Sequence, residues 1–236
     1  MKKAIFCWSG GKDSAYALHQ ILQAGEYDVK YLLTTINGEF KRISMHGVRE
    51  SLLEQQAMMI GIPLLKVMVY EGSNVEYEQQ MAHTLLQAKA EGVTHVIFGD
   101  IFLADLRAYR EQNLAKVDLE AVFPLWQKNT QQLIEDFVAQ GFKTMTCCVS
   151  DAYLDETWVG RDINHAFIEE LPSQVDACGE NGEYHTFCYD APYFKQAIAL
   201  TIGEKVYKPL LVKTTDAVCQ SDNQTKGFWF CDLLAV

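Results

Sequence analysis

The sequence has no apolar run long enough to cross a bilayer, and Met1-Lys2-Lys3 leads directly into an apolar segment without the pattern of a signal peptide. It is also short of positive charge, because 20 lysines and arginines face 31 aspartates and glutamates, for a net charge of −11. Broad electrostatic binding to nucleic acid is therefore not expected. We expect a cytoplasmic protein with no membrane partner, and the sequence leaves a homo-oligomer open.

Cysteine is present, but it lacks the spacings that would give it a metal-binding or redox role. The cysteines number seven, which is odd, and no C-x-x-C pair occurs in the chain. This absence argues against a zinc finger and against a thiolating enzyme, and reduced, mostly buried thiols are the expected state. Cys178 stands apart because it adjoins a segment rich in glycine and acidic residues.

Two common nucleotide-binding patterns are also missing, the Walker A loop and the dinucleotide fingerprint. In their place, Ser9-Gly10-Gly11-Lys12-Asp13-Ser14 lies between an apolar segment, residues 4–8, and a run with apolar residues at helical spacing. Glycine lets the backbone approach a ligand closely, and the free N–H groups at the start of a helix favour an anion. Together with the charge of Lys12, this strand–turn–helix unit predicts a phosphate-binding loop.

This loop resembles the PP-loop of the ATP pyrophosphatases, whose signature is Ser-Gly-Gly-x-Asp-Ser after the first strand. The resemblance implies that ATP is bound by Ser9, Gly10, Gly11, Lys12, Asp13 and Ser14.

The first half of the chain alternates apolar runs of strand length, at residues 29–36, 64–69 and 93–98, with helical patterns. This rhythm predicts an α/β fold with a parallel, doubly wound, Rossmann-like sheet over residues 1–122. The resemblance to the PP-loop enzymes implies that this sheet is of the adenine nucleotide alpha hydrolase type. In such sheets ligands lie outside the carboxyl ends of the strands, near the point where strand order reverses. The PP-loop, residues 46–49 and Gly99-Asp100 all follow predicted strands, and we expect the adenine base near residues 34–36, with Thr35 among its contacts.

The second half has a different pattern, and we place a domain boundary near residue 123 for that reason. A smaller α+β domain, residues 123–236, is expected to bind the substrate. Its predicted helices span residues 130–140 and 164–170, and its predicted strands span residues 143–149, 196–202, 207–213 and 227–233.

Several further motifs make the resemblance narrower, and together they are similar to the diphthine–ammonia ligase family over residues 1–194. Family enzymes use ATP and ammonia to convert the carboxylate of diphthine on elongation factor 2 into an amide, and they release AMP and pyrophosphate. The motifs are Ser44-Met45-His46-Gly47-Val48, Phe98-Gly99-Asp100-Ile101, Phe123-Pro124-Leu125-Trp126, Trp158-Val159-Gly160-Arg161 and Cys178-Gly179-Glu180-Asn181-Gly182-Glu183-Tyr184-His185-Thr186.

This chemistry assigns expected roles to individual residues. Lys12 and Mg²⁺ would neutralise the departing pyrophosphate, with Asp13 and Asp100 as the expected metal carboxylates. No appended glutaminase-like segment is visible, so free ammonium is the expected nitrogen source. The predicted catalytic residues are Lys12, Asp13, Asp100, Glu180 and Glu183. His46 and Gly99 are expected to contact ATP together with the PP-loop. The predicted substrate contacts are Arg107, Arg161, Gly182, His185 and Thr186, and Arg110 is a further candidate for binding an anionic group.

Two other functions remain open at this point. One is a PP-loop ATP pyrophosphatase acting on another acceptor, such as a small metabolite or a tRNA base. The other is a non-catalytic ATP-binding regulatory module, although such a module would not require Lys12, Asp13, Asp100 or the acidic motif at residues 178–186.

Overall fold

The computed structural model describes residues 1–43, 46–70, 74–210 and 225–236. Two predicted features fall partly outside this range: Ser44 and Met45 of one family motif, and residues 211–213 of one expected strand. No helix among the described residues is both long enough and apolar enough to cross a membrane.

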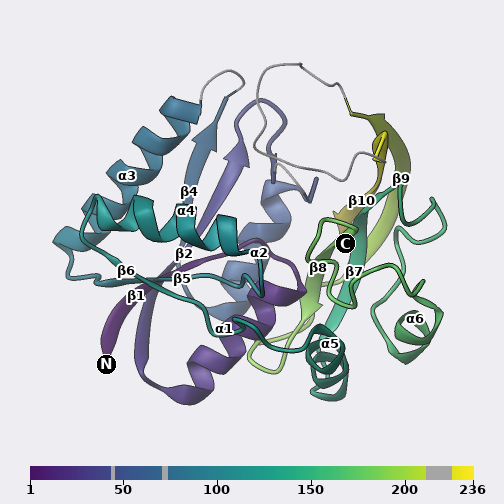
Figure 1. The fold of residues 1–236 in the computed structure, drawn as a ribbon, viewed down its shortest axis with the longest axis horizontal. Helices are drawn as coiled ribbons and strands as arrows, with labels where there is room; N and C mark the ends of the chain where they lie inside the picture. Colours follow the sequence, from purple (N-terminus) through teal and green to yellow (C-terminus); the bar gives the residue numbers. More distant parts are fainter. Residues whose placement is uncertain (44–45, 71–73, 211–224) are drawn as a thin grey trace.

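The strands belong to two sheets, and the fold is mixed α/β as predicted (Figure 1). Helices occur throughout: α1 (Lys12–Ala24), α2 (Glu50–Ile60), α3 (Asn74–Ala90), α4 (Ala104–Ala115), α5 (Thr130–Ala139) and α6 (His165–Glu170). Sheet A contains β1 (Lys2–Cys7), β2 (Tyr27–Asn37), β3 (Arg42–Ile43), β4 (Leu64–Val69), β5 (His95–Ile97) and β6 (Glu120–Val122), and sheet B contains β7 (Lys143–Ser150), β8 (Tyr184–Asp190), β9 (Leu200–Pro209) and β10 (Gly227–Ala235).

Sheet A is parallel except for the short strand β3. Its order is β3-β2-β1-β5-β6, with β4 paired to β2. The chain proceeds outward from β1 through β2 to β4 and then returns to β5 and β6 on the other side of β1. Strand order therefore reverses between β1 and β5, and the carboxyl ends of these two strands form the crevice where such sheets bind ligands.

Sheet B is antiparallel and has the order β8-β7-β10-β9. Here the expected strands at residues 196–202 and 207–213 are wrong in detail, because β9 is continuous from Leu200 to Pro209. β10 pairs with it on both sides of a register shift, from Leu200 to Ile202 and from Lys205 to Pro209. Three strands, β3, β6 and β8, had not been predicted. β8 begins within the glycine-rich and acidic motif of residues 176–187, and glycine and acidic residues do not predict a strand.

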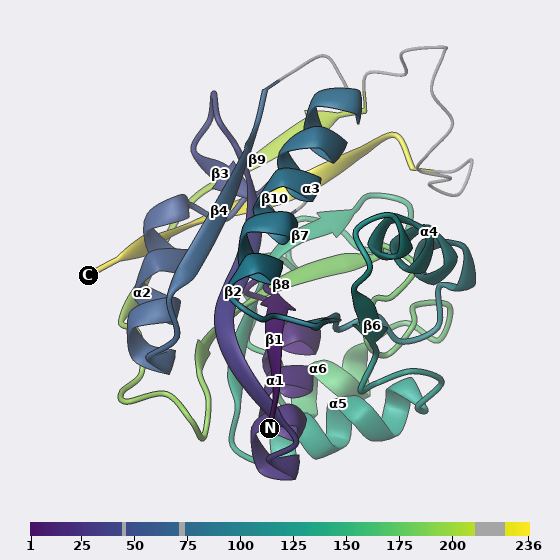
Figure 2. The same cartoon turned by 90° about the vertical axis from the view of Figure 1, so that its left-hand side faces the viewer.

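The two faces of sheet A pack against different layers. Ala4 and Phe6 contact a core shared with α1, α2, α5 and sheet B, whereas Ile5, between them, faces a second core under α3 and α4. Figure 2 looks toward this second face, with α3 passing in front of the sheet. This alternation is the period-2 pattern of a strand buried on both faces.

The two sheets meet at the PP-loop, and a buried glutamine of α2 joins them there. Gln56 has no exposed surface; its side-chain amide donates to the carbonyl of Gly10, at 2.9 Å, and to that of Cys188 in β8, at 2.6 Å. Its oxygen accepts a hydrogen bond from the indole of Trp8 at 2.8 Å. The Cys188 amide also donates to the Gly10 carbonyl at 2.8 Å, so β8 lies directly against the loop.

We predict that Gln56→Leu lowers the free energy of unfolding by about 2–4 kcal/mol, because the buried Trp8 indole and the Cys188 carbonyl lose their side-chain partner. Equilibrium urea unfolding measures this change. Gln55→Leu, one residue earlier and partly exposed, is the matched control and should change it by no more than about 0.5 kcal/mol. Equal effects of the two substitutions would contradict a special role for Gln56.

Candidate functional site

The two glycines of the PP-loop let the backbone pass close to its neighbours. Gly10 has a φ of +78°, and a Cβ there would lie 2.8 Å from Gln56 Oε1 and from Leu53 Cδ2. At Gly11 a Cβ would lie 3.0 Å from the Thr186 carbonyl oxygen. Both positions thus require glycine for close packing, which supplements the requirement for ligand approach inferred from the sequence.

Lys12 is the central cation of the loop, and it is almost completely buried. Its Nζ lies 2.8 Å from a carboxylate oxygen of Asp13, donates to the Cys178 carbonyl and lies 5.0 Å from the centre of the Tyr184 ring. Burial lowers the pKa of Lys12, but the adjacent Asp13, together with Tyr184 and Cys178, raises it and leaves that pKa above its ordinary value. The side chain is therefore charged across the physiological range.

The first amide of α1 is capped from the other sheet. The N–H of Lys12 donates to Thr186 Oγ1 at 3.0 Å, whereas Gly11, the N-cap residue, has no side chain to accept it. Within the loop, Ser9 Oγ donates to Ser14 Oγ at 3.1 Å and Ser14 donates to the Gly11 carbonyl at 2.9 Å. Of the predicted substrate contacts, Thr186 is thus brought directly against the ATP loop.

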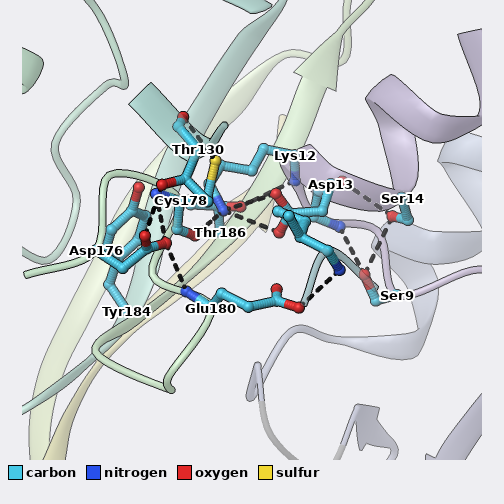
Figure 3. Close-up of polar contacts among 12 residues, drawn as sticks. Ser9, Lys12, Asp13, Ser14, Thr130, Asp176, Cys178, Glu180, Tyr184 and Thr186 are labelled. Carbon is cyan, nitrogen blue, oxygen red and sulfur yellow. Dashed lines mark hydrogen bonds and ion pairs between the residues drawn. The ribbon is translucent and has the colours of Figure 1, made fainter. Parts of the chain in front are cut away.

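Asp176, which the sequence analysis did not select, organises the late motif, residues 176–187. One of its carboxylate oxygens accepts from the amides of Cys178 and Glu180, and the other accepts from Thr130 of α5 at 2.7 Å (Figure 3). An acidic side chain three residues before a glycine-rich turn is the kind of signal that could have identified it.

Glu183 has a similar internal environment. It is 1% exposed, and its oxygens accept from the Asp176 amide at 2.9 Å, the Asn181 amide at 2.9 Å and the Asn181 side chain at 3.1 Å. These contacts differ from the open position expected of a catalytic acid, and they hold the turn of the late motif together.

Glu180 instead reaches across to sheet A. Its Oε1 accepts from the amide of Ile101 at 2.7 Å and from that of Phe102 at 3.3 Å, in the segment after β5. Figure 3 shows this side chain extending toward the PP-loop residues. Burial, with a further contribution from the negative charge of Asp13, raises the pKa of Glu180 to about 7.

Gly99, also after β5, fits tightly against the start of α1. A Cβ there would lie 3.1 Å from the Ser14 amide nitrogen and 3.2 Å from the Asp13 carbonyl oxygen. Thr35 lies at the other side of β1, in the part of β2 that pairs with β4, and its hydroxyl is hydrogen-bonded to Tyr77 of α3.

Two histidines lie together beside the loop. The rings of His46 and His185 are 4.8 Å apart, and His46 Nδ1 is 3.1 Å from the Thr186 carbonyl oxygen. Burial lowers the pKa of His46 to about 4 and that of His185 well below its ordinary value, so both rings are neutral at pH 7. His185 Nε2 is buried and has no hydrogen-bond partner among the described residues, whereas Gly182 faces open space.

The three arginines occupy different places. Arg107 stacks over Phe123 and Trp126 beyond the edge strand β6 and pairs with Glu111 at 2.8 Å. Arg161 stacks over Trp158 and pairs with Glu170 at 2.6 Å. The guanidinium of Arg110 pairs with Asp100, so this carboxylate, predicted to hold a metal, already has a cationic partner at 2.8 Å.

Comparison with known proteins gives the same identification as the motifs. A family model for the diphthamide synthase N-terminal domain matches residues 1–121, and one for the diphthamide synthase C-terminal domain matches residues 129–215. Relatives named diphthine–ammonia ligase include one from Homo sapiens, 28% identical over 84% of this chain and 82% of the relative, and one from Danio rerio, 25% identical over 84% and 86%.

The raised pKa of Glu180 predicts a pH dependence of stability. Between about pH 4.5 and pH 7 the Glu180 carboxyl keeps its proton in the folded chain but loses it in the unfolded chain, because the folded state disfavours the ionised form. The free energy of unfolding of the wild type should therefore fall as the pH rises through this interval. Glu180→Gln keeps an acceptor for the Ile101 amide, so the variant should gain about 1–2 kcal/mol relative to wild type over this interval. Urea unfolding at several pH values measures the difference, and a constant difference would refute the assignment.

Proposed function

Because this chain belongs to the diphthamide synthase family, we propose that it adenylates the carboxylate of diphthine on elongation factor 2 and aminates it with ammonium, releasing AMP and pyrophosphate. One structural observation carries the proposal. The late motif supplies the partners of Lys12, through Thr186 at its amide and Cys178 at its ammonium, so the ATP loop and the expected acceptor segment form one site. A translation factor as acceptor would place the reaction in the cytoplasm.

In the first step the residues of the PP-loop bind the β- and γ-phosphates of ATP. A carboxylate oxygen of the acceptor attacks the α-phosphorus, and the bond from that phosphorus to the oxygen bridging to the β-phosphate breaks. Lys12 stabilises the charge that develops on pyrophosphate, together with the positive end of the α1 dipole. Ser9 and Ser14, which bond to each other and within the loop, are available to donate to phosphate oxygens instead.

Asp13 fits a magnesium ion better than Asp100 does. The side chain of Asp13 is 31% exposed at the loop, and Mg²⁺ at phosphates prefers one or two carboxylates with water. Each carboxylate is already paired with a cation, Asp13 with Lys12 and Asp100 with Arg110, but the side chain of Asp100 is only 11% exposed. When bound, the ion would neutralise negative charge on the phosphates. No group of three or more His, Cys, Asp or Glu side chains suited to a metal occurs among the described residues.

In the second step ammonia attacks the acyl carbon, the carbon–oxygen bond to AMP breaks, and a proton leaves the new amide nitrogen. Glu180, whose pKa of about 7 suits proton transfer at neutral pH, is the group that we assign as the base. His185 and Thr186 contact the acceptor, and Glu183 acts as a positioning residue through the turn of the late motif. The predicted substrate contacts of Arg107 and Arg161 stay predictions.

The test is the nucleotide product formed from α-labelled ATP with Mg²⁺ and ammonium, with and without elongation factor 2 bearing diphthine. We expect AMP and pyrophosphate only with the modified factor, and we expect Lys12→Met to slow their formation by at least about 100-fold. Lys128→Met, which removes an exposed lysine bonded to Gln20 of α1, is the matched control and should leave the rate unchanged.

The other outcomes separate the alternatives. AMP formed without the factor would assign another acceptor, such as a small metabolite or tRNA base. ADP in place of AMP would rule out adenylation, and ATP that binds but is never cleaved would favour a regulatory module.

A further inference from the structure

Arg110 of α4 lies against the two central strands between which the order of sheet A reverses. Its guanidinium is 4.5 Å from the ring centre of Phe98, which directly follows β5. The charges of Arg110 and Asp100 both act on the thiol of Cys7, the last residue of β1, and Ser9 of the PP-loop follows two residues later. The guanidinium therefore lies beside the start of the PP-loop, on the face of the sheet opposite to α1.

The pair that Arg110 makes with Asp100 leaves hydrogen-bonding capacity unused. Nη2 donates to Asp100 Oδ1 at 3.0 Å. Arg110 Nε and Asp100 Oδ2 lie 2.8 Å apart, yet both are buried atoms without an aligned hydrogen bond to any described residue. These two atoms face each other and have no exposed surface, so a ligand would contact the remaining part of the guanidinium. The Arg110 side chain remains 29% exposed, which leaves part of it open to a ligand.

The charge on the other side of the crevice is already committed. Lys12 Nζ is bound by Asp13 and by the Cys178 carbonyl, and the proposed function assigns it to the pyrophosphate. A nucleotide bound across the carboxyl ends of β1 and β5 needs a second cation for the phosphate nearer its ribose. A guanidinium suits this task because its planar array of N–H groups matches a phosphate.

We propose that Arg110 binds the α-phosphate of the nucleotide and that Asp100 is its positioning residue, not a ligand of the metal. The inference rests on the proposed function, since it specifies which residue binds the phosphate at which the acceptor carboxylate attacks. It separates Arg110, which pairs with Asp100 directly after β5, from Arg107 and Arg161, which pair with Glu111 and Glu170.

The test compares the affinities of ATP, AMP and adenosine by calorimetry, because AMP retains only the α-phosphate and adenosine has none. Wild type should prefer AMP to adenosine. Arg110→Met should weaken AMP binding by about 10- to 100-fold, which is the range for loss of a hydrogen bond to a charged group, and should change the affinity for adenosine by no more than about twofold. Arg110→Lys, which keeps the charge but loses the planar fork, should lie between the two, and its melting temperature controls for folding.

Lys116→Met is the matched control, since Lys116 is exposed at the end of the same helix and its ammonium donates to Asn113. It should leave all three affinities unchanged. Equal loss of AMP and adenosine binding in Arg110→Met, or no loss of either, would overturn the proposal. A wild type that binds no ATP at all would instead refute the proposed function.

The role of Asp100 is tested by titrating Mg²⁺ against ATP binding. If Asp100 positions Arg110, Asp100→Asn should weaken AMP binding severalfold without changing the Mg²⁺ concentration for half-maximal ATP binding. In the double variant, Asp100→Asn should weaken AMP binding little beyond the effect of Arg110→Met alone. A tenfold rise in that Mg²⁺ concentration, seen in Asp100→Asn but not in Arg110→Met, would show that Asp100 is a metal ligand and would overturn the proposal.

Discussion

The hydrogen bond between the Lys12 amide and Thr186 Oγ1 is the contact on which the arrangement of the site depends. It caps the first turn of α1 with a side chain from sheet B, because Gly11 cannot cap the helix itself. Beside it, the Cys188 amide and the Gln56 side chain hold the Gly10 carbonyl. The conformation of the PP-loop is therefore set by both sheets, although its sequence lies wholly in the first.

A second constraint is the negative charge collected around a single lysine. Asp13, Asp176 and Glu180 all act on the Cys178 thiol beside Lys12, so carboxylates outnumber cations at the junction. A site of this kind repels a polyphosphate unless further positive charge arrives or protons are retained. Glu180, whose pKa is raised mainly by burial and further by the charge of Asp13, retains a proton there, and a metal ion and the guanidinium of Arg110 would supply positive charge.

The sequence was sufficient for the parts of this account that depend on local pattern. The strand–loop–helix unit at residues 2–24 and the parallel sheet followed from apolar spacing and from the glycines at 10 and 11, and the structure confirmed both. The pairing of β8 with the PP-loop was not predictable, since it joins residues more than 170 positions apart. For the same reason sequence alone could not distinguish Glu180, which reaches sheet A, from Glu183, which closes its own turn.

Hydrogen–deuterium exchange with and without a non-hydrolysable ATP analogue tests most directly whether the ATP site is shared by the two sheets. The decisive amides are Lys12 in the loop, Cys188 in β8 and Glu180 in the late motif, each hydrogen-bonded at the junction. If both sheets form the site, the analogue should slow exchange together in residues 9–14 and in residues 176–188. Slower exchange confined to residues 9–14 would contradict the account, because the nucleotide would then be bound by sheet A alone.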